Sequence, residues 1–387
     1  MACADLCDEL KEAGAADFPV ALRAARRLRA SAKRPSIAGR LGRALALAAG
    51  AAAIAATIGA AALAQGATVI DPGLLPAEAA PLAQKSLLLD LAQAGSRYVA
   101  VGERGHVLTS DNRGQTWSQA AGVPSQEMLT SVCFSDEQHG VAVGHDEIAL
   151  VTSDAGNSWQ RTHYAPDARQ PLLDVLCNGS EVIAVGAYGA YFTSSDRGAT
   201  WASRKFDAQP VPVKKGVPRK AGDPQEEDEI GADFHLNRIV GASGSRLYIA
   251  AEAGHLYRSD DAGKTWNELP SPYEGSFFGI LPLDGDALLA YGLRGHLYRS
   301  DDGGQTWRHI EVGTDAMLND AVRTPQNGVA IVGLSGTVLL SKDGGETFTL
   351  HQQPDRKGLS AALPVGVTEL VTAGEAGVRA IPVEAPK

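Results

Sequence analysis

Three histidines recur at one position of a repeated motif, and they are the first residues in this sequence that could hold a metal. His106, His255 and His296 each follow the last glycine of a short glycine-containing motif. Imidazole is a common zinc ligand, but equivalent positions of different repeats should lie well beyond the roughly 4 Å between two ligands of one metal. The sequence has no zinc-type Cys/His spacing, phosphate-binding loop or dinucleotide-binding glycine motif. We therefore expect no metal and no cofactor.

Ionisable residues near the start of the first strand of each repeat form a second candidate site. Alignment of the repeats places seven residues at this position: Asp90, Ser131, Asp174, Arg238, Gly279, Asp320 and Ala361. One interpretation is a ring of solvated residues around a water-filled channel, in which Arg238 offsets nearby carboxylates. The other is a polar grip on a peptide or small ligand, with Asp174, Arg238 and Asp320 as partner-binding residues.

The turns after the second strand of each repeat form a third candidate site. They would make one ring on the same face, containing Glu103, Arg104, His145, Asp146, Tyr188, Glu252, Arg294 and Glu375. Surface loops are the usual sites of recognition, and tyrosine and arginine are common interface anchors. Arg104, Tyr188 and Arg294 are therefore further candidates for partner binding. The alternative is that all eight are ordinary solvated turn residues.

A catalytic site would need a definite constellation of charged groups. A sialidase needs an arginine triad, a Tyr–Glu nucleophile pair and an acid, and other glycosidases need two carboxylates about 5 to 10 Å apart. The Arg-Ala-Ile-Pro string at 379–382 stands at the wrong end of the chain to be the sialidase Arg-Ile-Pro motif. We predict that the protein is not an enzyme, and the alternative is a carbohydrate-active enzyme of the sialidase or glycosidase kind.

Six similar octets define the elements that would position these residues. They follow the pattern Ser/Thr-x-Asp-x-Gly-x-Thr-aromatic, and their aromatic ends are spaced 42, 42, 65, 41 and 41 residues apart. Short hydroxyl and carboxylate side chains can bond the free backbone groups of a turn, and glycine tolerates a positive φ there. We therefore predict a structural role for Asn112, Asp154, Asp196, Asp261, Asp302, Asp343, Trp117, Trp159, Trp201, Trp266, Trp307 and Phe348.

A glycine-containing motif precedes each octet and occurs a seventh time at 373–377 without an octet behind it. Alternating apolar runs flank each motif, which indicates short strands joined by tight turns. A period of 40 to 45 residues with four strands is typical of a propeller blade. We predict an all-β, seven-bladed propeller of four-stranded antiparallel blades. Residues 67–70 should supply the missing outer strand of the last blade by pairing with residues 378–383.

The octets are Asp-boxes, also called BNR repeats. The strings GVAVGHDEIALVTSDAGNSW (140–159) and YGLRGHLYRSDDGGQTW (291–307) resemble the photosystem II assembly and stability factor family of seven-bladed propellers. The resemblance covers about residues 85–383. It implies an exported, non-catalytic assembly or accessory factor for photosynthesis, whose partner is a membrane protein or complex subunit at the membrane surface. We expect the factor to be monomeric.

The sequence before the repeats indicates export. Residues 44–64 form an uncharged, alanine-rich stretch that ends in a small-x-small sequence, and a cluster of basic residues lies just before it: Arg23, Arg26, Arg27, Arg29, Lys33, Arg34, Arg40 and Arg43. This composition is typical of a signal peptide, although the stretch is also long enough to span a bilayer. We expect a periplasmic or lumenal protein, which would be membrane-anchored if the signal is retained.

The predicted domains are a leader at 1–64, a closing segment at 65–84 and a propeller at 85–387. A charged, proline-containing insertion at about 205–235 accounts for the one long interval between octets. Such a stretch cannot bury enough apolar surface to order itself, so we expect a mobile loop between blades 3 and 4. It is a tolerated surface loop or a place of partner-specific contact.

Net charge and cysteine positions complete the expectations. The formal net charge of -10 argues against nucleic acid as a partner, because binding to phosphates needs a basic surface.

Cys133 and Cys177 fall on the inner strands of neighbouring blades and are out of phase with each other. A disulfide needs a Cα separation below about 7 Å, so we expect two buried free thiols rather than a bridge.

Overall fold

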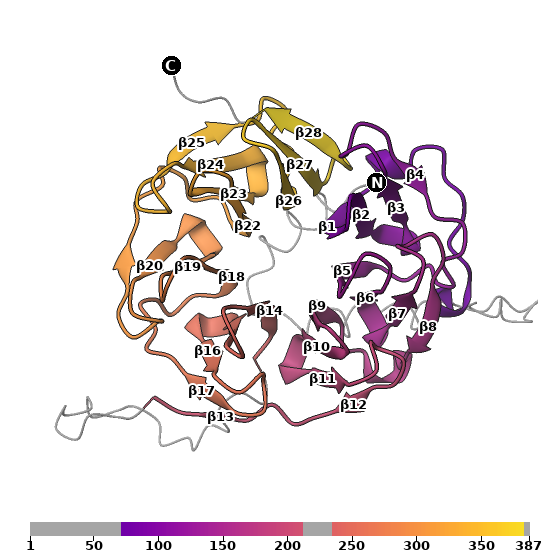
Figure 1. The fold of residues 1–387 in the computed structure, drawn as a ribbon, viewed down its shortest axis with the longest axis horizontal. Coiled ribbons are helices and arrows are strands. Elements are labelled where there is room, and N and C mark those ends of the chain that lie inside the picture. Colours follow the sequence, from indigo (N-terminus) through magenta and orange to yellow (C-terminus); the bar gives the residue numbers. More distant parts are fainter. Residues whose placement is uncertain (1–70, 212–233, 383–387) are drawn as a thin grey trace, which may run out of the picture. The chain divides into compact units, whose positions relative to one another are not determined.

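The computed structural model describes residues 71–211 and 234–382, which fall within one compact unit, Val69–Lys387. In these residues the chain forms seven sheets, or blades, that follow one another around a ring, and neighbouring strands within each blade are antiparallel apart from one added parallel strand in blade 4 (Figure 1). This arrangement confirms the predicted all-β, seven-bladed propeller. The described part of the chain has no helix long and apolar enough to cross a membrane.

The blades use consecutive strands, and most have four. The strands of blades 1 to 3 are β1 (Leu88–Ala94), β2 (Arg97–Gly102), β3 (Val107–Ser110), β4 (Ser118–Gln119), β5 (Leu129–Phe134), β6 (Gly140–Gly144), β7 (Ala149–Thr152), β8 (Gln160–His163), β9 (Leu172–Asn178), β10 (Glu181–Gly186), β11 (Tyr191–Ser194) and β12 (Ala202–Ser203). Blade 4 contains β13 (Ala208–Gln209), β14 (Leu236–Gly241), β15 (Leu247–Ala251), β16 (Leu256–Ser259) and β17 (Trp266–Glu268). Blades 5 to 7 contain β18 (Phe277–Pro282), β19 (Leu288–Gly292), β20 (Leu297–Ser300), β21 (Arg308–His309), β22 (Leu318–Thr324), β23 (Gly328–Gly333), β24 (Thr337–Ser341), β25 (Thr349–Gln352), β26 (Leu359–Val365), β27 (Glu369–Gly374) and β28 (Arg379–Pro382).

Short 3-10 turns connect the second and third strands of six blades. They are η3 (Glu103–Gly105), η4 (His145–Glu147), η6 (Ala187–Gly189), η7 (Glu252–Gly254), η8 (Leu293–Gly295) and η9 (Leu334–Gly336), and the other short turns are η1 (Pro72–Leu74), η2 (Ala83–Lys85) and η5 (Pro166–Ala168). Because strands alternate in direction, these six turns lie on one side of the ring, which we call the turn face. The Asp-box turns lie on the opposite side.

The second strand of each blade is buried on both faces after its first residue rather than alternating. Every residue of β6 and β23 is buried, for example. Both faces of such a strand are covered because neighbouring blades stack on it, as in the central strands of other sheets that are buried on both sides. The cores therefore lie between blades: Trp159 of blade 2 is 4% exposed and belongs to one cluster with Val99 and Val101 of blade 1.

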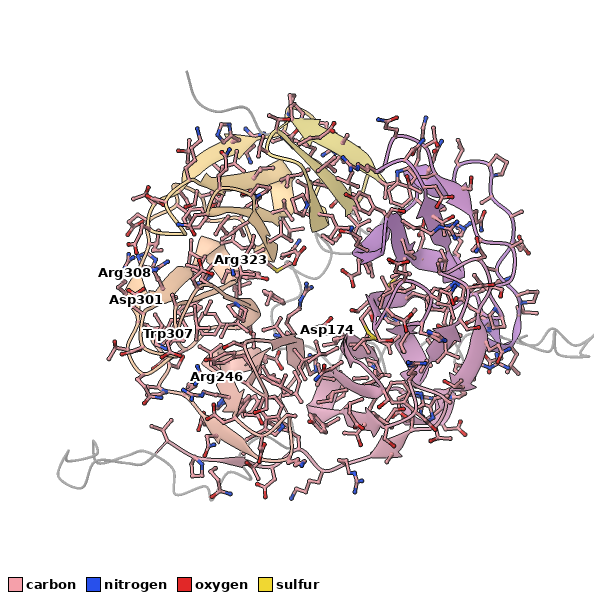
Figure 2. The ribbon with its side chains drawn as sticks, in the orientation of Figure 1. Asp174, Arg246, Asp301, Trp307, Arg308 and Arg323 are labelled. Atoms are coloured by element: carbon pink, nitrogen blue, oxygen red, sulfur yellow. A yellow bond between two sulfur atoms is a disulfide. The ribbon has the colours of Figure 1, made fainter. Side chains whose placement is uncertain are left out.

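Hydrogen bonds within the Asp-box turns show what the octets do. In blade 5 the Ser300 hydroxyl donates to Asp302 Oδ1 (2.8 Å) and accepts from the Gly304 N–H (2.8 Å). The Asp302 carboxylate accepts from the N–H and the hydroxyl of Thr306, and these bonds lower its pKa to about 2. The next residue, Trp307, packs in the outer part of the ring (Figure 2). These carboxylates are occupied by their own turns.

The first octet keeps this geometry with an amide in place of the carboxylate. Asn112 Oδ1 accepts from the Thr116 N–H (2.9 Å), as the aspartates do. Its Nδ2 donates to the Thr116 hydroxyl (2.8 Å), which reverses the bond that an aspartate would accept. The threonine hydroxyl can donate or accept, which explains why Asn112 fits at this position.

The ring closes by packing between blades 7 and 1. Leu91, Tyr98 and Leu108 of blade 1 share one buried cluster with Ala361 and Val371 of blade 7. In the described residues blade 7 has three strands, and residues 67–70, which we expect to supply a fourth, lie outside them. The described chain begins beside blade 2, where the Tyr164 hydroxyl donates to Asp71.

The start of the insertion between blades 3 and 4 is ordered, contrary to the expected mobile loop. Phe206 is 3% exposed and packs against Tyr191, Tyr257 and Trp266. The strand β13 follows and pairs in parallel with β17, so that blade 4 has five strands. The ring of Phe206 gives this part of the insertion enough buried apolar surface to be ordered, although most residues of the insertion are polar or charged. Residues 212–233 lie outside the described part.

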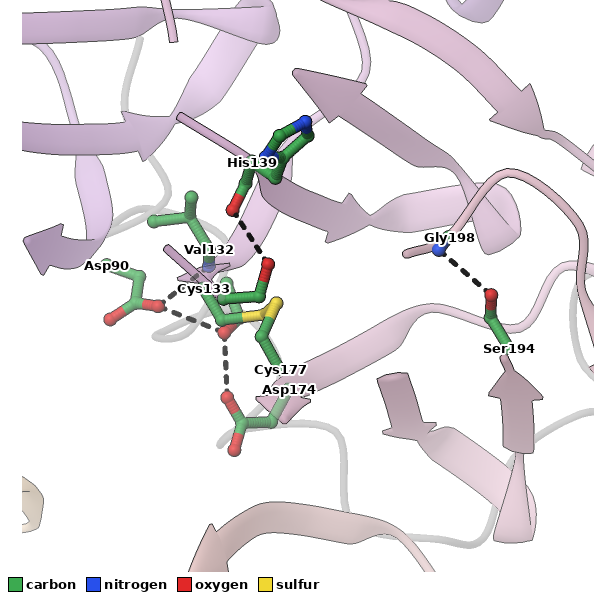
Figure 3. Close-up of a disulfide and its surroundings, with 10 residues drawn as sticks. Asp90, Val132, Cys133, His139, Asp174, Cys177, Ser194 and Gly198 are labelled. Carbon is green, nitrogen blue, oxygen red and sulfur yellow. Dashed lines mark hydrogen bonds between the residues drawn. A yellow bond between two sulfur atoms is a disulfide. The ribbon is translucent and has the colours of Figure 1, made fainter. Parts of the chain in front are cut away.

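The two mature cysteines form a disulfide, so the expectation of free thiols is wrong. Cys133 on β5 and Cys177 on β9 have Cα atoms 5.6 Å apart and join blades 2 and 3 (Figure 3). Neighbouring blades stack face to face, so one face of blade 2 meets the opposite face of blade 3. Side chains on opposite faces of equivalent strands are one residue out of phase. The phase difference that argued against a bridge is therefore what a bridge between blades requires.

Candidate functional site

The aligned residues of the first strands meet at the centre of the ring and tie the blades together. Asp90 of blade 1 accepts a hydrogen bond from the Val132 N–H of blade 2 (2.8 Å). Asp174 of blade 3 accepts from the Ile239 N–H of blade 4 (2.8 Å). Asp320 of blade 6 accepts from the Ala362 N–H of blade 7 in the same way (2.9 Å). Each aspartate thus binds the residue that follows the aligned position in the next blade.

Blade 5 makes the equivalent tie with a different residue. Its aligned position is Gly279, and a Cβ there would lie 2.1 Å from the hydroxyl oxygen of Tyr291. Burial raises the pKa of this hydroxyl, against the lowering effect of the Ala321 backbone N–H of blade 6 beside it. Tyr291 therefore takes the place that a side chain at Gly279 would occupy. Sequence reasoning missed this residue because it comes from the second strand rather than the first.

Arg238 connects blade 4 to carboxylates of two other blades. Its Nη2 donates to Asp320 Oδ1 (2.9 Å) and its Nε lies 3.6 Å from Asp174 Oδ2. Burial lowers the pKa of the guanidinium, but the carboxylates of Asp320 and Asp174 outweigh it and raise the pKa well above its ordinary value. Arg238 is charged at every accessible pH and neutralises part of a buried acidic cluster.

The hydroxyl of Ser131 lies between two carboxylates. Its oxygen is 2.9 Å from Asp90 Oδ2 and 2.7 Å from Asp174 Oδ1. A hydroxyl has one proton to donate, so the second contact is favourable only when one carboxyl is protonated. Burial raises the pKa of Asp90 to about 7, against the lowering effect of Arg238. Asp90 is therefore the group that holds this proton.

These contacts correct the interpretation of a solvated ring. Asp90, Ser131, Asp174 and Asp320 are 7%, 3%, 4% and 2% exposed, and their polar atoms are bonded within the protein. Arg238 keeps 27% of its side-chain surface accessible. The sequence alignment brought the right residues together, but their burial depends on how closely the blades approach. Binding of a partner by Asp174, Arg238 or Asp320 stays a prediction.

The centre of the ring predicts a pH dependence of stability. The pKa of Asp90 is about 7 in the folded protein, above its ordinary 3.8, so the folded state binds the proton more tightly. Stability should therefore fall as the pH rises between these two values. We expect a higher midpoint of urea unfolding at pH 5 than at pH 8. Asp90→Asn, which mimics the protonated carboxyl, should reduce this difference.

The exposed Asp167→Asn is the matched control for this experiment and should keep the wild-type pH dependence. An Asp90→Asn variant with the full wild-type dependence would show that another group carries it. Asp320 is the first alternative, because burial also raises its pKa.

Arg104, Tyr188 and Arg294 lie at the tips of equivalent turns on the turn face. They are the central residues of η3, η6 and η8, with φ of 54°, 53° and 56°. All three are exposed, and 55% of Tyr188 is accessible although its ring packs edge-on against His235. They belong to blades 1, 3 and 5. No hydrogen bond or ion pair joins them to the central carboxylates of Asp90, Asp174 and Asp320. Of the six candidate residues, the structure brings together only Asp174, Arg238 and Asp320.

Blade 2 departs from this turn geometry at a residue that sequence reasoning missed. Glu147 has a φ of 54° where the other turns have glycine. Its carboxylate is 3.1 Å from Nε2 of His163, and the residue is 6% exposed. The signal in the sequence is the motif VGHDE, which lacks the final glycine. In residues 71–211 and 234–382 no group of three or more His, Cys, Asp or Glu side chains is arranged to hold a metal ion.

Comparisons with known proteins agree with this architecture. The family model described as "Photosynthesis system II assembly factor YCF48" matches residues 109–215, and the BNR/Asp-box repeat model matches residues 298–309. A search of curated proteins gave no match.

Several solved structures share the fold. "YCF48 bound to D1 peptide" is 19% identical, with 78% of this chain and 94% of that chain covered and a TM-score of 0.58. YCF48 from Cyanidioschyzon merolae is 16% identical over 76% of this chain and 94% of that one, with a TM-score of 0.58. A GH74 xyloglucanase from Xanthomonas campestris is 13% identical over 80% of this chain and 52% of that one, with a TM-score of 0.57. The protein is a seven-bladed propeller of BNR/Asp-box repeats that resembles the photosystem II assembly factor YCF48.

Proposed function

We propose that this protein is an exported, non-catalytic binding protein that holds a segment of a membrane protein during assembly. The observation that carries the proposal is the shared position of Arg104, Tyr188 and Arg294 at the exposed tips of equivalent turns. A rigid ring holds these tips on one face, so little conformational freedom is lost when a partner binds. Tyrosine and arginine side chains are common anchors of such contacts.

Two features support export. The disulfide between Cys133 and Cys177 is of the kind that persists in oxidising compartments and is rare in the cytosol. The basic and then alanine-rich sequence of residues 1–64 is typical of a signal peptide. Both suit a monomer that works in the periplasm or a lumen, at the surface of the membrane that holds its partner.

The chemistry of the central carboxylates supports a role without catalysis. A glycosidase needs two carboxyl groups free to act on either side of a glycosidic bond. Asp90 and Asp174 lie beside the same Ser131 hydroxyl, and each also accepts a backbone N–H from the next blade. Asp174 and Asp320 also form ion pairs with the Arg238 guanidinium. These groups are engaged in holding the ring together.

The resemblance to YCF48 suggests the kind of partner. One similar structure is described as YCF48 bound to D1 peptide. By analogy, the partner of the present chain would be an exported segment of a membrane protein, which is either a photosystem subunit or another membrane protein.

The test is affinity purification from detergent-solubilised membranes, followed by identification of the partner. We expect the wild-type protein to enrich one integral membrane protein. The double variant Tyr188→Ala, Arg294→Ala should reduce the recovery of this protein about tenfold or more, because it removes one or two anchors of the interface. Arg113→Ala, at an exposed Asp-box turn on the opposite face, should leave the recovery unchanged. Equal recovery with both variants would contradict the proposed face.

A further inference from the structure

The segment that precedes β1 shows how a groove of this ring holds a peptide. It contains the 3-10 turns η1 and η2, and the chain leaves η1 in an extended conformation at Leu75 (φ -93°, ψ 140°). We call residues 71–85 the strap; its first eleven residues, DPGLLPAEAAP, are rich in proline and alanine. The Gln126 N–H donates to the Pro72 carbonyl (2.9 Å), and the Ala77 N–H donates to the Val123 carbonyl (2.9 Å). The side-chain amide of Gln119 donates to the Glu78 carbonyl (2.8 Å) and accepts from the Ala80 N–H (2.8 Å).

These bonds place the strap in a groove between blades 1 and 2 on the turn face. Three parts of the protein form the groove: the turn η3, the end of β4 and the loop from β4 to β5. Beside the strap a cavity of about 390 Å³ remains, lined by Pro72, Glu78, Ala79, Ala80, Arg104, His106 and Gln126. The groove therefore holds the strap backbone through the loop from β4 to β5 and through side chains: Gln119 at the end of the outer strand, Gln126, whose amide donates to the Pro76 carbonyl (2.9 Å), and Arg161, which donates to the Gly73 carbonyl.

The same groove recurs beside the loop between blades 4 and 5, where the described residues include no counterpart of the strap, although the ring of Phe234 packs against His255 with centroids 4.2 Å apart. His255 occupies the position of His106 at the start of the third strand. Glu268 occupies the position of Gln119, because it pairs with Tyr257 as Gln119 pairs with Leu108. The loop positions also match: the added Cβ at Gly254 would meet the Tyr273 carbonyl, as that at Gly105 would meet the Ser125 carbonyl. This places Glu274 where blade 1 has Gln126.

The second groove is an open hollow with an aromatic and acidic lining. Its volume is about 520 Å³, and its lining residues are Ala253, Gly254, His255, Glu268, Ser271, Pro272, Tyr273 and Glu274. The ring of Tyr273 stacks on His296, with centroids 4.1 Å apart. Nδ1 of His255 lies 2.6 Å from Oε1 of Glu268. The lining contains two carboxylates and no lysine or arginine.

We propose that the groove between blades 4 and 5 binds an extended, proline-containing segment of a partner protein that carries a basic side chain. The strap shows the backbone conformation that this type of groove accepts. Aromatic-lined grooves suit the preformed extended conformation of proline-containing peptides. The carboxylates of Glu268 and Glu274, which replace the amides of Gln119 and Gln126, select a positive charge. This site includes the tip of η7 but none of Arg104, Tyr188 and Arg294, and it does not rest on the proposed function.

Fluorescence anisotropy of two labelled synthetic peptides tests the proposal. One has the sequence of residues 71–81, and the other has the same sequence with Glu78→Lys. We expect the lysine peptide to bind the full protein more tightly than the unchanged peptide. Glu268→Gln should weaken binding of the lysine peptide about tenfold, the equivalent of one charged contact, and should abolish the preference between the two peptides.

A second variant and a control keep the test decisive. Tyr273→Ser should also weaken binding, because it removes the aromatic wall. Glu268→Gln and Tyr273→Ser each introduce the residue that blade 1 has at that position, so both should fold, which thermal unfolding will verify. Glu137→Gln, an exposed carboxylate on the opposite side of the ring, should bind as the wild type does.

Three results would overturn the proposal. The first is the lack of saturable binding of either peptide at millimolar protein. The second is binding of the lysine peptide that neither Glu268→Gln nor Tyr273→Ser weakens. The third is tighter binding of the unchanged peptide, which would mean that the groove takes the strap of a second copy of this chain. Failure to recover a membrane partner would leave this test unaffected.

Discussion

Replacing Arg238 by methionine is expected to lower the free energy of unfolding by about 3 kcal/mol or more at pH 8. The substitution keeps much of the side-chain volume but leaves Asp174 and Asp320 buried without their positive partner. Removal of one member of a buried ion pair costs about 3 to 5 kcal/mol, because the remaining charge is uncompensated. Urea unfolding at constant temperature measures the change.

The cost should be smaller at pH 5, because burial raises the pKa of Asp320 and of Asp90, and protonation removes part of the unpaired charge. Arg246→Met is the matched control. Arg246 pairs with Asp260 and Asp286 near the outside of the ring, where the partners are exposed (Figure 2). Exposed pairs contribute about 0 to 1 kcal/mol. Equal losses for the two arginines would show that the central cluster is not the buried network described above.

Removing the disulfide is expected to have an effect of similar size. The bond joins residues that are 44 apart in the sequence. Closing a loop of that length restricts the unfolded chain and is worth about 4 kcal/mol in the chain-entropy relation. The double variant Cys133→Ser, Cys177→Ser should therefore unfold at a lower urea concentration than the wild type.

The wild-type protein under reducing conditions should match the double variant. Reductant should not change the unfolding midpoint of the double variant itself, which controls for effects of the reagent on other parts of the protein. A double variant as stable as the oxidised wild type would show that the link between blades 2 and 3 adds nothing to the packing around it.

The repeats predicted the architecture because their pattern is redundant. Each of six octets carries its own turn-forming Ser or Thr, its Asp or Asn and its glycine. The glycine-containing motif occurs a seventh time at 373–377, so counting this motif gave seven blades. The aligned position of the first strands was also visible, which brought Asp174, Arg238 and Asp320 into one group. A residue that acts once, such as Tyr291, has no periodic signal, and Glu147 is marked only by the missing glycine of its motif.

Burial and contacts between blades could not be predicted from the period. The sequence shows that Asp90 and Ser131 share a repeat position, but the distance between their oxygens depends on how neighbouring sheets stack. Phe206 looked like part of a charged loop because its partners, Tyr257 and Trp266, come from the following blade. In each case the missing information is three-dimensional: which residue of one repeat meets which residue of the next.

The one-residue offset between Cys133 and Cys177 also bears on how such a ring can acquire covalent links. In a molecule of copied units, a cysteine inherited at the same place in every copy would point its thiol in the same rotational sense around the ring. No two of these thiols would face each other. When the repeat carries a single cysteine, a bridge between adjacent copies can therefore arise only after the copies diverge and a mutation in one unit breaks the symmetry of the ancestral repeat.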